Sequence, residues 1–156
     1  MSTKSEPTSN LFRICRKEQH LSIEKVSELT DYLSTSRIQR IESETFCIRP
    51  DEAICLARCY RRPELLNYYC SELCAIGQIL APKVSSSDIS NIHINLISAT
   101  ERVSNFNSRI IHSLTSTNDN ITEEIAGLYI QLLKTLHELS ECEISLSIWM
   151  YKNIQQ

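Results

Sequence analysis

Residues 21–42 read LSIEKVSELTDYLSTSRIQRIE and contain the clearest helix signals in the chain. Ser22 and Ser34 each suit the N-cap of a helix, because a serine oxygen accepts hydrogen bonds from the free backbone N–H groups of the first turn. Each serine precedes a pair of apolar residues at i, i+3, a spacing typical of one buried helical face. The sequence therefore predicts two helices, over residues 22–30 and 34–43, with inward residues Val26, Leu29, Ile38 and Ile41.

The second of these helices carries an outward face that is short, polar and cationic. We expect its two arginines to have no acidic partners. Short polar side chains and arginines in the first two turns of a helix suit contacts with base edges in a major groove and with phosphates. A polar helix face that only contacts water is the competing interpretation. The face consists of Thr35, Ser36, Arg37, Gln39 and Arg40.

The same residues resemble the Cro/repressor-like (XRE) helix-turn-helix family. The resemblance rests on Leu21-Ser22, Glu24 and Val26, followed by residues 36–42, SRIQRIE. It extends to YYCSELCAIG, which is similar to the end of the DNA-binding domain in a group of small bacterial regulators of the family. The resemblance implies that bases are contacted by Ser34, Thr35, Ser36 and Arg40.

The resemblance also implies an ion pair between Arg16 and Glu42, which joins the first helix of the domain to the recognition helix. The corner TDYLSTSRI is one residue longer than is usual in the family. Two registers of the recognition helix therefore stay open, and Arg37 is a further candidate base contact. Asp31 and Glu44 stand where the family often has glycine. We expect phosphate contacts from Ser22, Lys25 and Arg49.

The composition indicates one or two small soluble domains rich in helix. The 156 residues are 42% hydrophobic and 22% charged, with two glycines and four prolines. The net charge of −3 divides into +2 for residues 1–62 and −5 for residues 63–156, which places the basic excess beside the helix-turn-helix pattern. The sequence has no apolar run of transmembrane length and no secretory signal, so we expect a cytoplasmic protein with double-stranded DNA, not a membrane, as partner.

We expect residues 1–78 to form a five-helix repressor-like domain within an all-α protein. Pro50 and Pro63 are expected to begin its last two helices, because proline suits the first helical turn. Gly77 is expected to end the fifth helix. Residues 79–85 contain proline and serine and are interpreted as a linker.

Residues 86–156 contain two heptad seams typical of a long antiparallel helical hairpin. One seam recurs every seven residues over positions 89–110 and the other over positions 125–146. Packing these seams against each other leaves further apolar residues uncovered, which indicates self-association into a homodimer. The expected contact contains Ile97, Ile111, Ile130, Leu136, Ile144 and Ile148.

Seven cysteines raise the question of a metal site. Cys55 and Cys59, like Cys70 and Cys74, are spaced i, i+4, so two such helices packed face to face would offer four thiolates to zinc. However, this is not the common zinc-knuckle spacing, and cysteine is among the residues most often buried. We therefore favour their interpretation as small core residues and expect no metal and no cofactor.

The sequence shows no catalytic pattern, since it lacks a glycine-rich phosphate loop and a nucleophile elbow and its histidines are scattered. We expect no enzyme. The expected function is sequence-specific transcriptional regulation, with repression favoured over activation, by a homodimer on a pseudo-palindromic operator. The alternative is a protein-interaction module, an antirepressor or adaptor that contacts a regulatory protein or peptide and has little DNA affinity.

Overall fold

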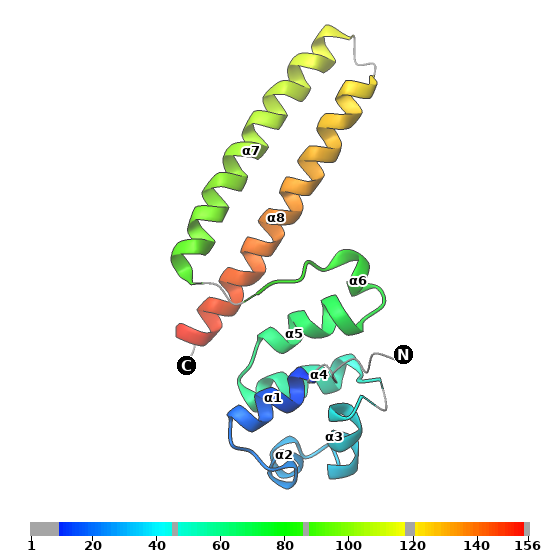
Figure 1. Cartoon of the computed structure of the whole chain (residues 1–156), viewed down its shortest axis with the longest axis vertical. Helices are drawn as coiled ribbons and strands as arrows, with labels where there is room; N and C mark the ends of the chain where they lie inside the picture. Colours follow the sequence, from blue (N-terminus) through cyan, green and yellow to red (C-terminus); the bar gives the residue numbers. More distant parts are fainter. Residues whose placement is uncertain (1–9, 45–46, 86–87, 118–120, 155–156) are drawn as a thin grey trace, which may run out of the picture. The chain divides into compact units, whose positions relative to one another are not determined.

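Helices account for 78% of the residues that the structure describes, and no strand occurs among them, so the predicted all-α class is confirmed. The chain divides into two compact units, Met1–Lys83 and Val84–Gln156. No helix within the described ranges is both long enough and apolar enough to cross a membrane. The computed structural model describes residues 10–44, 47–85, 88–117 and 121–154 (Figure 1).

The first unit is built from short helices with polar caps. Its elements are α1 (Leu11–Glu18), α2 (Ile23–Thr30), α3 (Thr35–Glu42), α4 (Pro50–Tyr60), α5 (Glu64–Tyr68), the π-helical turn η1 (Tyr69–Leu73) and α6 (Gly77–Leu80). Asn10, Ser22 and Ser34 accept hydrogen bonds from backbone N–H groups two or three residues ahead and cap α1, α2 and α3. Pro50 begins α4, as predicted.

Side chains from five helices meet in the core of the first unit. Phe12 of α1, Val26 of α2, Ile38 of α3, Leu56 of α4 and Leu65 of α5 are fully buried. Burial of a large apolar side chain contributes ~1.5–3 kcal/mol, so this cluster supplies much of the stability of the unit. The core fixes the inner side of α3 and leaves its outer side in solvent.

Non-glycine residues adopt left-handed backbone conformations just after each of α1 to α4. His20, Asp31, Glu44 and Arg61 have φ values of 51° to 57°. Glycine is the usual residue at such helix ends, because a Cβ disfavours this conformation. Asp31 and Glu44 therefore turn the chain in a conformation that glycine adopts more readily.

The last helices of the first unit differ from the sequence prediction. α5 ends at Tyr68 and passes into η1, and Gly77 begins α6 instead of ending the fifth helix. A Cβ on Gly77 would lie 2.0 Å from the carbonyl oxygen of Cys70. Glycine is needed here for close backbone approach, a role that a sequence pattern does not distinguish from a helix stop.

The expected linker, residues 79–85, is also partly structured. Pro82 is buried, and its carbonyl accepts a hydrogen bond of 2.8 Å from Nδ2 of Asn67 in α5. Lys83 Nζ lies 2.6 Å from a carboxylate oxygen of Glu72 in η1. These contacts hold the chain against α5 and η1 as far as Lys83, which is where the first unit ends.

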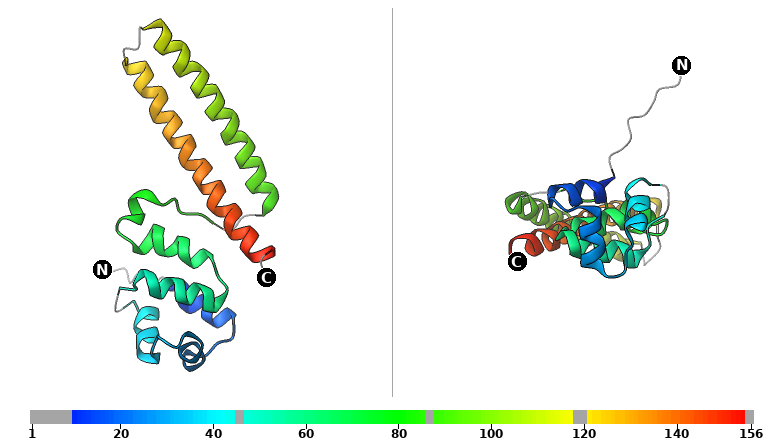
Figure 2. Two further views of the ribbon diagram at one scale, coloured as in Figure 1. Left: turned by 180° about the vertical axis from the view of Figure 1, so that it is seen from behind. Right: turned by 90° about the horizontal axis from the view of Figure 1, so that it is seen from below.

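The second unit consists of two long helices, α7 (Ile89–Ser116) and α8 (Glu123–Asn153), which lie side by side and antiparallel (Figures 1 and 2). Asp88 caps α7 and Thr122 caps α8 through side-chain oxygens. The buried side chains of this unit all occupy heptad seam positions, either in the two rows that recur every seven residues or three residues after a member of those rows. They are Ile92, Ala99 and Ile110 in α7 and Ile125, Leu128, Thr135 and Cys142 in α8.

We predict opposite effects of alanine at the two glycines. Gly77→Ala should lower the free energy of unfolding by ~1–3 kcal/mol, because its Cβ would overlap the Cys70 carbonyl. Gly127→Ala should raise it by about 1 kcal/mol, because nothing lies within 4 Å of a Cβ there and alanine favours the interior of α8. Urea denaturation of both variants measures the two changes, and equal effects of the same sign would contradict this assignment.

Candidate nucleic-acid interface

The corner between α2 and α3 resolves the register that the sequence left open. Ser34 is the N-cap of α3, and its Oγ accepts a hydrogen bond of 3.3 Å from the backbone N–H of Arg37. Leu33 is buried within the corner, where its carbonyl accepts a 2.8 Å hydrogen bond from the Ser27 hydroxyl of α2. Asp31 follows α2 in a left-handed backbone conformation, which turns the chain into this corner.

The outer side of α3 is polar and open to solvent. Ser34, Ser36, Gln39 and Arg40 are exposed, and Thr35 is half-buried. Ile38 and Ile41 on the inner side are buried in the core, so the helix cannot rotate its polar residues inward without exposing them. Of the five candidate base contacts, Ser34, Ser36 and Arg40 therefore lie on the exposed surface.

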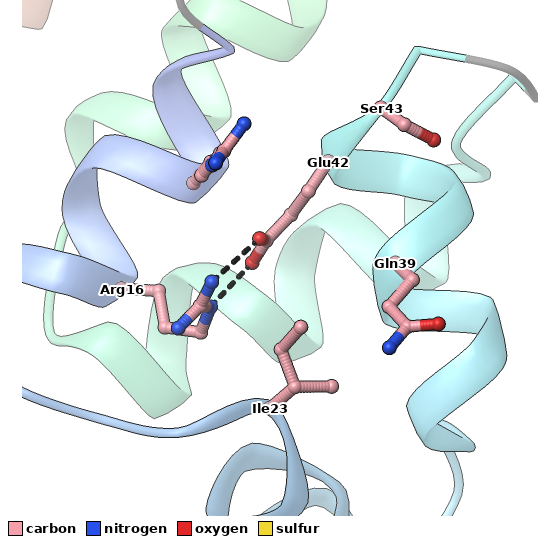
Figure 3. A pocket seen from close by; sticks show the side chains of 6 residues that line it. Arg16, Ile23, Gln39, Glu42 and Ser43 are labelled. Atoms are coloured by element: carbon pink, nitrogen blue, oxygen red, sulfur yellow. Dashed lines mark hydrogen bonds and ion pairs between the residues drawn. The ribbon is translucent and has the colours of Figure 1, made fainter.

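Arg16 and Glu42 form the ion pair that the family resemblance implies (Figure 3). Arg16 donates from Nε at 2.6 Å and from Nη2 at 2.8 Å to the two carboxylate oxygens of Glu42, and from Nη1 at 2.7 Å to the carbonyl of Leu21. Both side chains are largely buried. This bidentate pair fixes the C-terminal end of α3 to α1 and to the start of the α2 segment.

A shallow cleft of about 180 Å³ opens beside this ion pair (Figure 3). Its polar rim includes Arg13 of α1, Gln39 of α3 and Ser43, with Ile23 of α2 on the apolar side. Arg13 was not among the site residues predicted from the sequence. It is far from α3 along the chain, and only the fold brings the two close together. The cleft places an exposed guanidinium at the edge of the α3 surface, where a phosphate could be contacted.

Arg37 corrects the expectation that the arginines of the recognition helix have no acidic partners. It donates from Nε at 2.7 Å and from Nη2 at 2.6 Å to the carboxylate of Glu52, and from Nη2 at 3.0 Å to the Cys47 carbonyl. Glu52 lies at the start of α4 with 1% of its side chain exposed. Arg37 therefore joins the N-terminal end of α3 to α4 and is a structural residue.

Glu52 is a structural residue of the site that sequence reasoning missed. Besides Arg37, its carboxylate accepts a 2.8 Å hydrogen bond from the backbone N–H of Arg49. Burial acts to raise the pKa of Glu52, but the hydrogen bonds from Arg37 and Arg49 outweigh it and leave the pKa below its usual value. A glutamate in the first turn of a helix is common for its favourable interaction with the helix dipole, and nothing in the spacing of Glu52 reveals Arg37 as its partner.

The three expected phosphate contacts also lie among polar partners. Arg49 donates to the Tyr32 hydroxyl at 3.1 Å and lies 3.5 Å from the Asp51 carboxylate, and Tyr32 in turn donates to Asp51. Lys25 lies 3.0 Å from Glu28, and Ser22 caps α2. The side chains of both cations remain more than half exposed, and exposed ion pairs are worth ~0–1 kcal/mol, so a phosphate can compete for them.

The four cysteines spaced i, i+4 were expected to be core residues. This expectation is corrected, because none of the four is fully buried. Cys55 and Cys59 of α4 pack at the edge of the core beside Leu29, and burial raises the pKa of both thiols. Cys70 is exposed and Cys74 is half-buried. Within the described ranges, no three Cys, His, Asp or Glu residues come together as metal ligands.

The residues expected to form the dimer contact fall into two groups. Ile97, Ile111, Ile130 and Leu136 are exposed on α7 and α8, as uncovered apolar side chains. Ile144 and Ile148 are half-buried, so they are less exposed than the other four.

Comparison with protein-family models, with curated proteins and with solved structures finds no match to this chain.

We predict that both arginine–glutamate pairs of α3 are needed for stability. Arg37→Ala and Arg16→Ala should each lower the free energy of unfolding by about 3 kcal/mol, because each leaves a buried carboxylate without its partner. Gln39→Ala, an exposed change on the same helix, is the matched control and should alter it by less than ~0.5 kcal/mol. Thermal and urea unfolding measure the stability of all three variants. An Arg37→Ala curve that matches the curve of Gln39→Ala would show that the Arg37–Glu52 pair does not stabilise the fold.

The lowered pKa of Glu52 predicts a specific pH dependence. Its ionised form is favoured in the folded state, so its contribution to stability is complete above the usual pKa of 4.5 and is lost as the pH falls further. Glu52→Gln should be less stable than wild type near neutral pH, and this difference should shrink below pH 4.5. Unfolding curves of both proteins measured across this range would refute the assignment if the difference stayed constant.

Proposed function

We propose that the protein is a sequence-specific DNA-binding transcriptional regulator of the XRE helix-turn-helix type, more a repressor than an activator, and that it binds as a homodimer. α3 is the recognition helix in this proposal, and α2 lies across the DNA backbone. Ser34, Ser36 and Arg40 contact base edges, with Thr35 beside them. Arg37 is removed from the set of base contacts.

The observation that carries the proposal is the firmly fixed polar surface of α3. Its exposed residues include hydroxyl groups, the Gln39 amide and the Arg40 guanidinium, which are the donors and acceptors that read bases in a major groove. Ion pairs at both ends of the helix hold it in one orientation. Base readout needs such preorganisation, because a misplaced bidentate contact loses its discrimination.

Phosphate contacts complete the proposed interface. Arg13 at the cleft rim, Lys25 and Arg49 are exposed cations on α1, on α2 and at the start of α4. Lys25 and Arg49 are partly neutralised by acids, and the first 62 residues carry a net charge of only +2. Non-specific affinity should therefore be weak, and binding should depend strongly on base contacts and on salt concentration.

A second copy supplies the remaining binding energy in this proposal. Two recognition helices separated by about one DNA turn, ~34 Å, read two half-sites related by a two-fold axis. The long helices of the second unit, with their exposed isoleucines and leucines, provide the contact between copies.

The pairing of cations with acids favours one alternative, a protein-interaction module with little DNA affinity. Arg37, Lys25 and Arg49 each have a carboxylate within 4 Å, and Glu44 adds a negative charge after α3. In this alternative the surface of α3 contacts a regulatory protein or peptide. The two candidates differ in whether Arg40 affects binding to duplex DNA.

We predict that Arg40→Ala weakens operator binding by ~1–3 kcal/mol and relaxes base preference at one position of each half-site, as expected for loss of a bidentate base contact. A gel-shift titration against the DNA upstream of the protein's own gene measures this at fixed salt concentration. Lys17→Ala, an exposed change on α1, is the control. Absence of any sequence-dependent shift for wild type would favour the interaction module, and equal shifts for wild type and Arg40→Ala would refute the base contact.

A further inference from the structure

Two cysteines of α4 line one cleft of the first unit. Both thiols are half-buried and pack against the edge of the core. Leu29 and Ile54, which line the same cleft, are 55% and 42% exposed, so the thiols can be reached from solvent. The cleft has a volume of about 270 Å³, and its lining consists of Leu29 and Thr30 of α2 with Asp51, Ile54, Cys55, Arg58 and Cys59 of α4.

The spacing of Cys55 and Cys59 suits a ligand that bridges them and does not suit a disulfide. Residues four apart on a helix have Cβ atoms about 5–6 Å apart, whereas a disulfide needs about 3.5–4.5 Å. Both cysteines lie inside α4, so a disulfide between them would require the helix to unwind. Metal–thiolate bonds are about 2.3 Å long, so an ion held in line between two sulfurs keeps them ~4.6 Å apart. The helix therefore presents the two thiols at a separation that one ion can span.

The number and type of available ligands decide which ion fits this cleft. Among the residues that the structure describes, no three Cys, His, Asp or Glu side chains come together as metal ligands. Asp51 lines the cleft, but its carboxylate accepts a hydrogen bond from Tyr32 and lies 3.5 Å from the Arg49 guanidinium. Structural zinc needs four ligands, so two thiolates do not make a zinc site. Thiolates select soft ions, and Cu(I) is a soft ion that two thiolates can hold.

The charges around the thiols are compatible with such a complex. Burial raises the pKa of both thiols and, for Cys55, outweighs the opposite effect of the Arg58 guanidinium. Both thiols therefore carry their protons near neutral pH, and Cu(I) must displace two protons when it binds. The resulting complex of one Cu(I) and two thiolates has a charge of −1, and the guanidinium of Arg58 lies in the lining of the same cleft.

We propose that Cys55 and Cys59 form a binding site for Cu(I), which bridges their two sulfur atoms in the cleft between α2 and α4. Two S–H bonds are replaced by two Cu–S bonds, two protons leave to solvent, and no electron is transferred. The proposal departs from the sequence-based expectation of no metal, which rested on zinc coordination and on burial of the thiols as core residues. It does not depend on DNA binding, so it stands or falls separately from the proposed function.

A second pair of cysteines with the same sequence spacing provides a matched control. Cys70 lies in η1, and Cys74 follows η1 in an extended conformation, with φ −89° and ψ 119°. The regular α-helical spacing that places Cys55 and Cys59 on one face is therefore not kept between these two residues. Cys70 is also exposed, whereas both cysteines of α4 are half-buried. The structure thus separates two pairs that the sequence does not distinguish.

Titration of the reduced full-length protein with Cu(I) tests the site, in the absence of oxygen and in competition with the chromophoric chelator bicinchoninate. Cys55→Ser and Cys59→Ser each remove one ligand, and Cys70→Ser and Cys74→Ser are the controls. We expect wild type and both controls to bind one ion per chain with equal affinity. Each α4 variant should lose more than the roughly 10–100-fold in affinity that loss of an indirect metal partner costs. Circular dichroism checks that all four variants keep their helix content.

X-ray absorption at the copper edge examines the wild-type complex and needs no variant that must fold. We expect two sulfur neighbours around the copper. Copper neighbours other than two sulfurs, failure of wild type to take Cu(I) from the chelator, or an affinity that neither α4 variant lowers would each overturn the proposal.

Discussion

The structure depends on the way α3 is held at both of its ends. Glu42 at its C-terminal end receives two hydrogen bonds from Arg16 of α1, and Arg37 near its N-terminal end gives two to Glu52 of α4. Each pair is bidentate and each carboxylate is almost fully buried, so neither can release its partner without a large desolvation penalty. Between them, Ile38 and Ile41 fill the core. The outer side of α3 is consequently presented in a single orientation.

The ion pairs that hold this region together also reduce the positive charge that is available for binding. Arg37 is withdrawn from the surface, and the network of Arg49, Tyr32 and Asp51 ties another cation to the start of α4. A surface with little net positive charge gains little affinity from phosphates, so in the proposed function specificity comes from the side chains of α3 and from binding by two copies. In the proposed function, the fixed orientation of α3, and not strong electrostatic attraction, supports binding.

Local signals explain what the sequence predicted. The caps Ser22 and Ser34, the start at Pro50 and the heptad seams depend on residues within one or two helical turns, and the structure has all of them. The pair of Arg37 with Glu52 joins residues 15 positions apart on different helices, and no spacing rule identifies it. Gly77 was misassigned because close approach to the Cys70 carbonyl exists only after the chain has folded. Cys70 is exposed and lies in the π-helical turn η1, which the periodicity of the sequence does not predict.

Selection of binding sites from a pool of random duplex DNA by the full-length protein is the most direct test of the central claim. In the proposed function, α3 reads bases and two copies bind together. We therefore expect enrichment of a pseudo-palindromic sequence whose half-site centres are about one helical turn apart, ~34 Å. Failure to enrich any sequence, or enrichment of a single half-site without two-fold symmetry, would contradict the account.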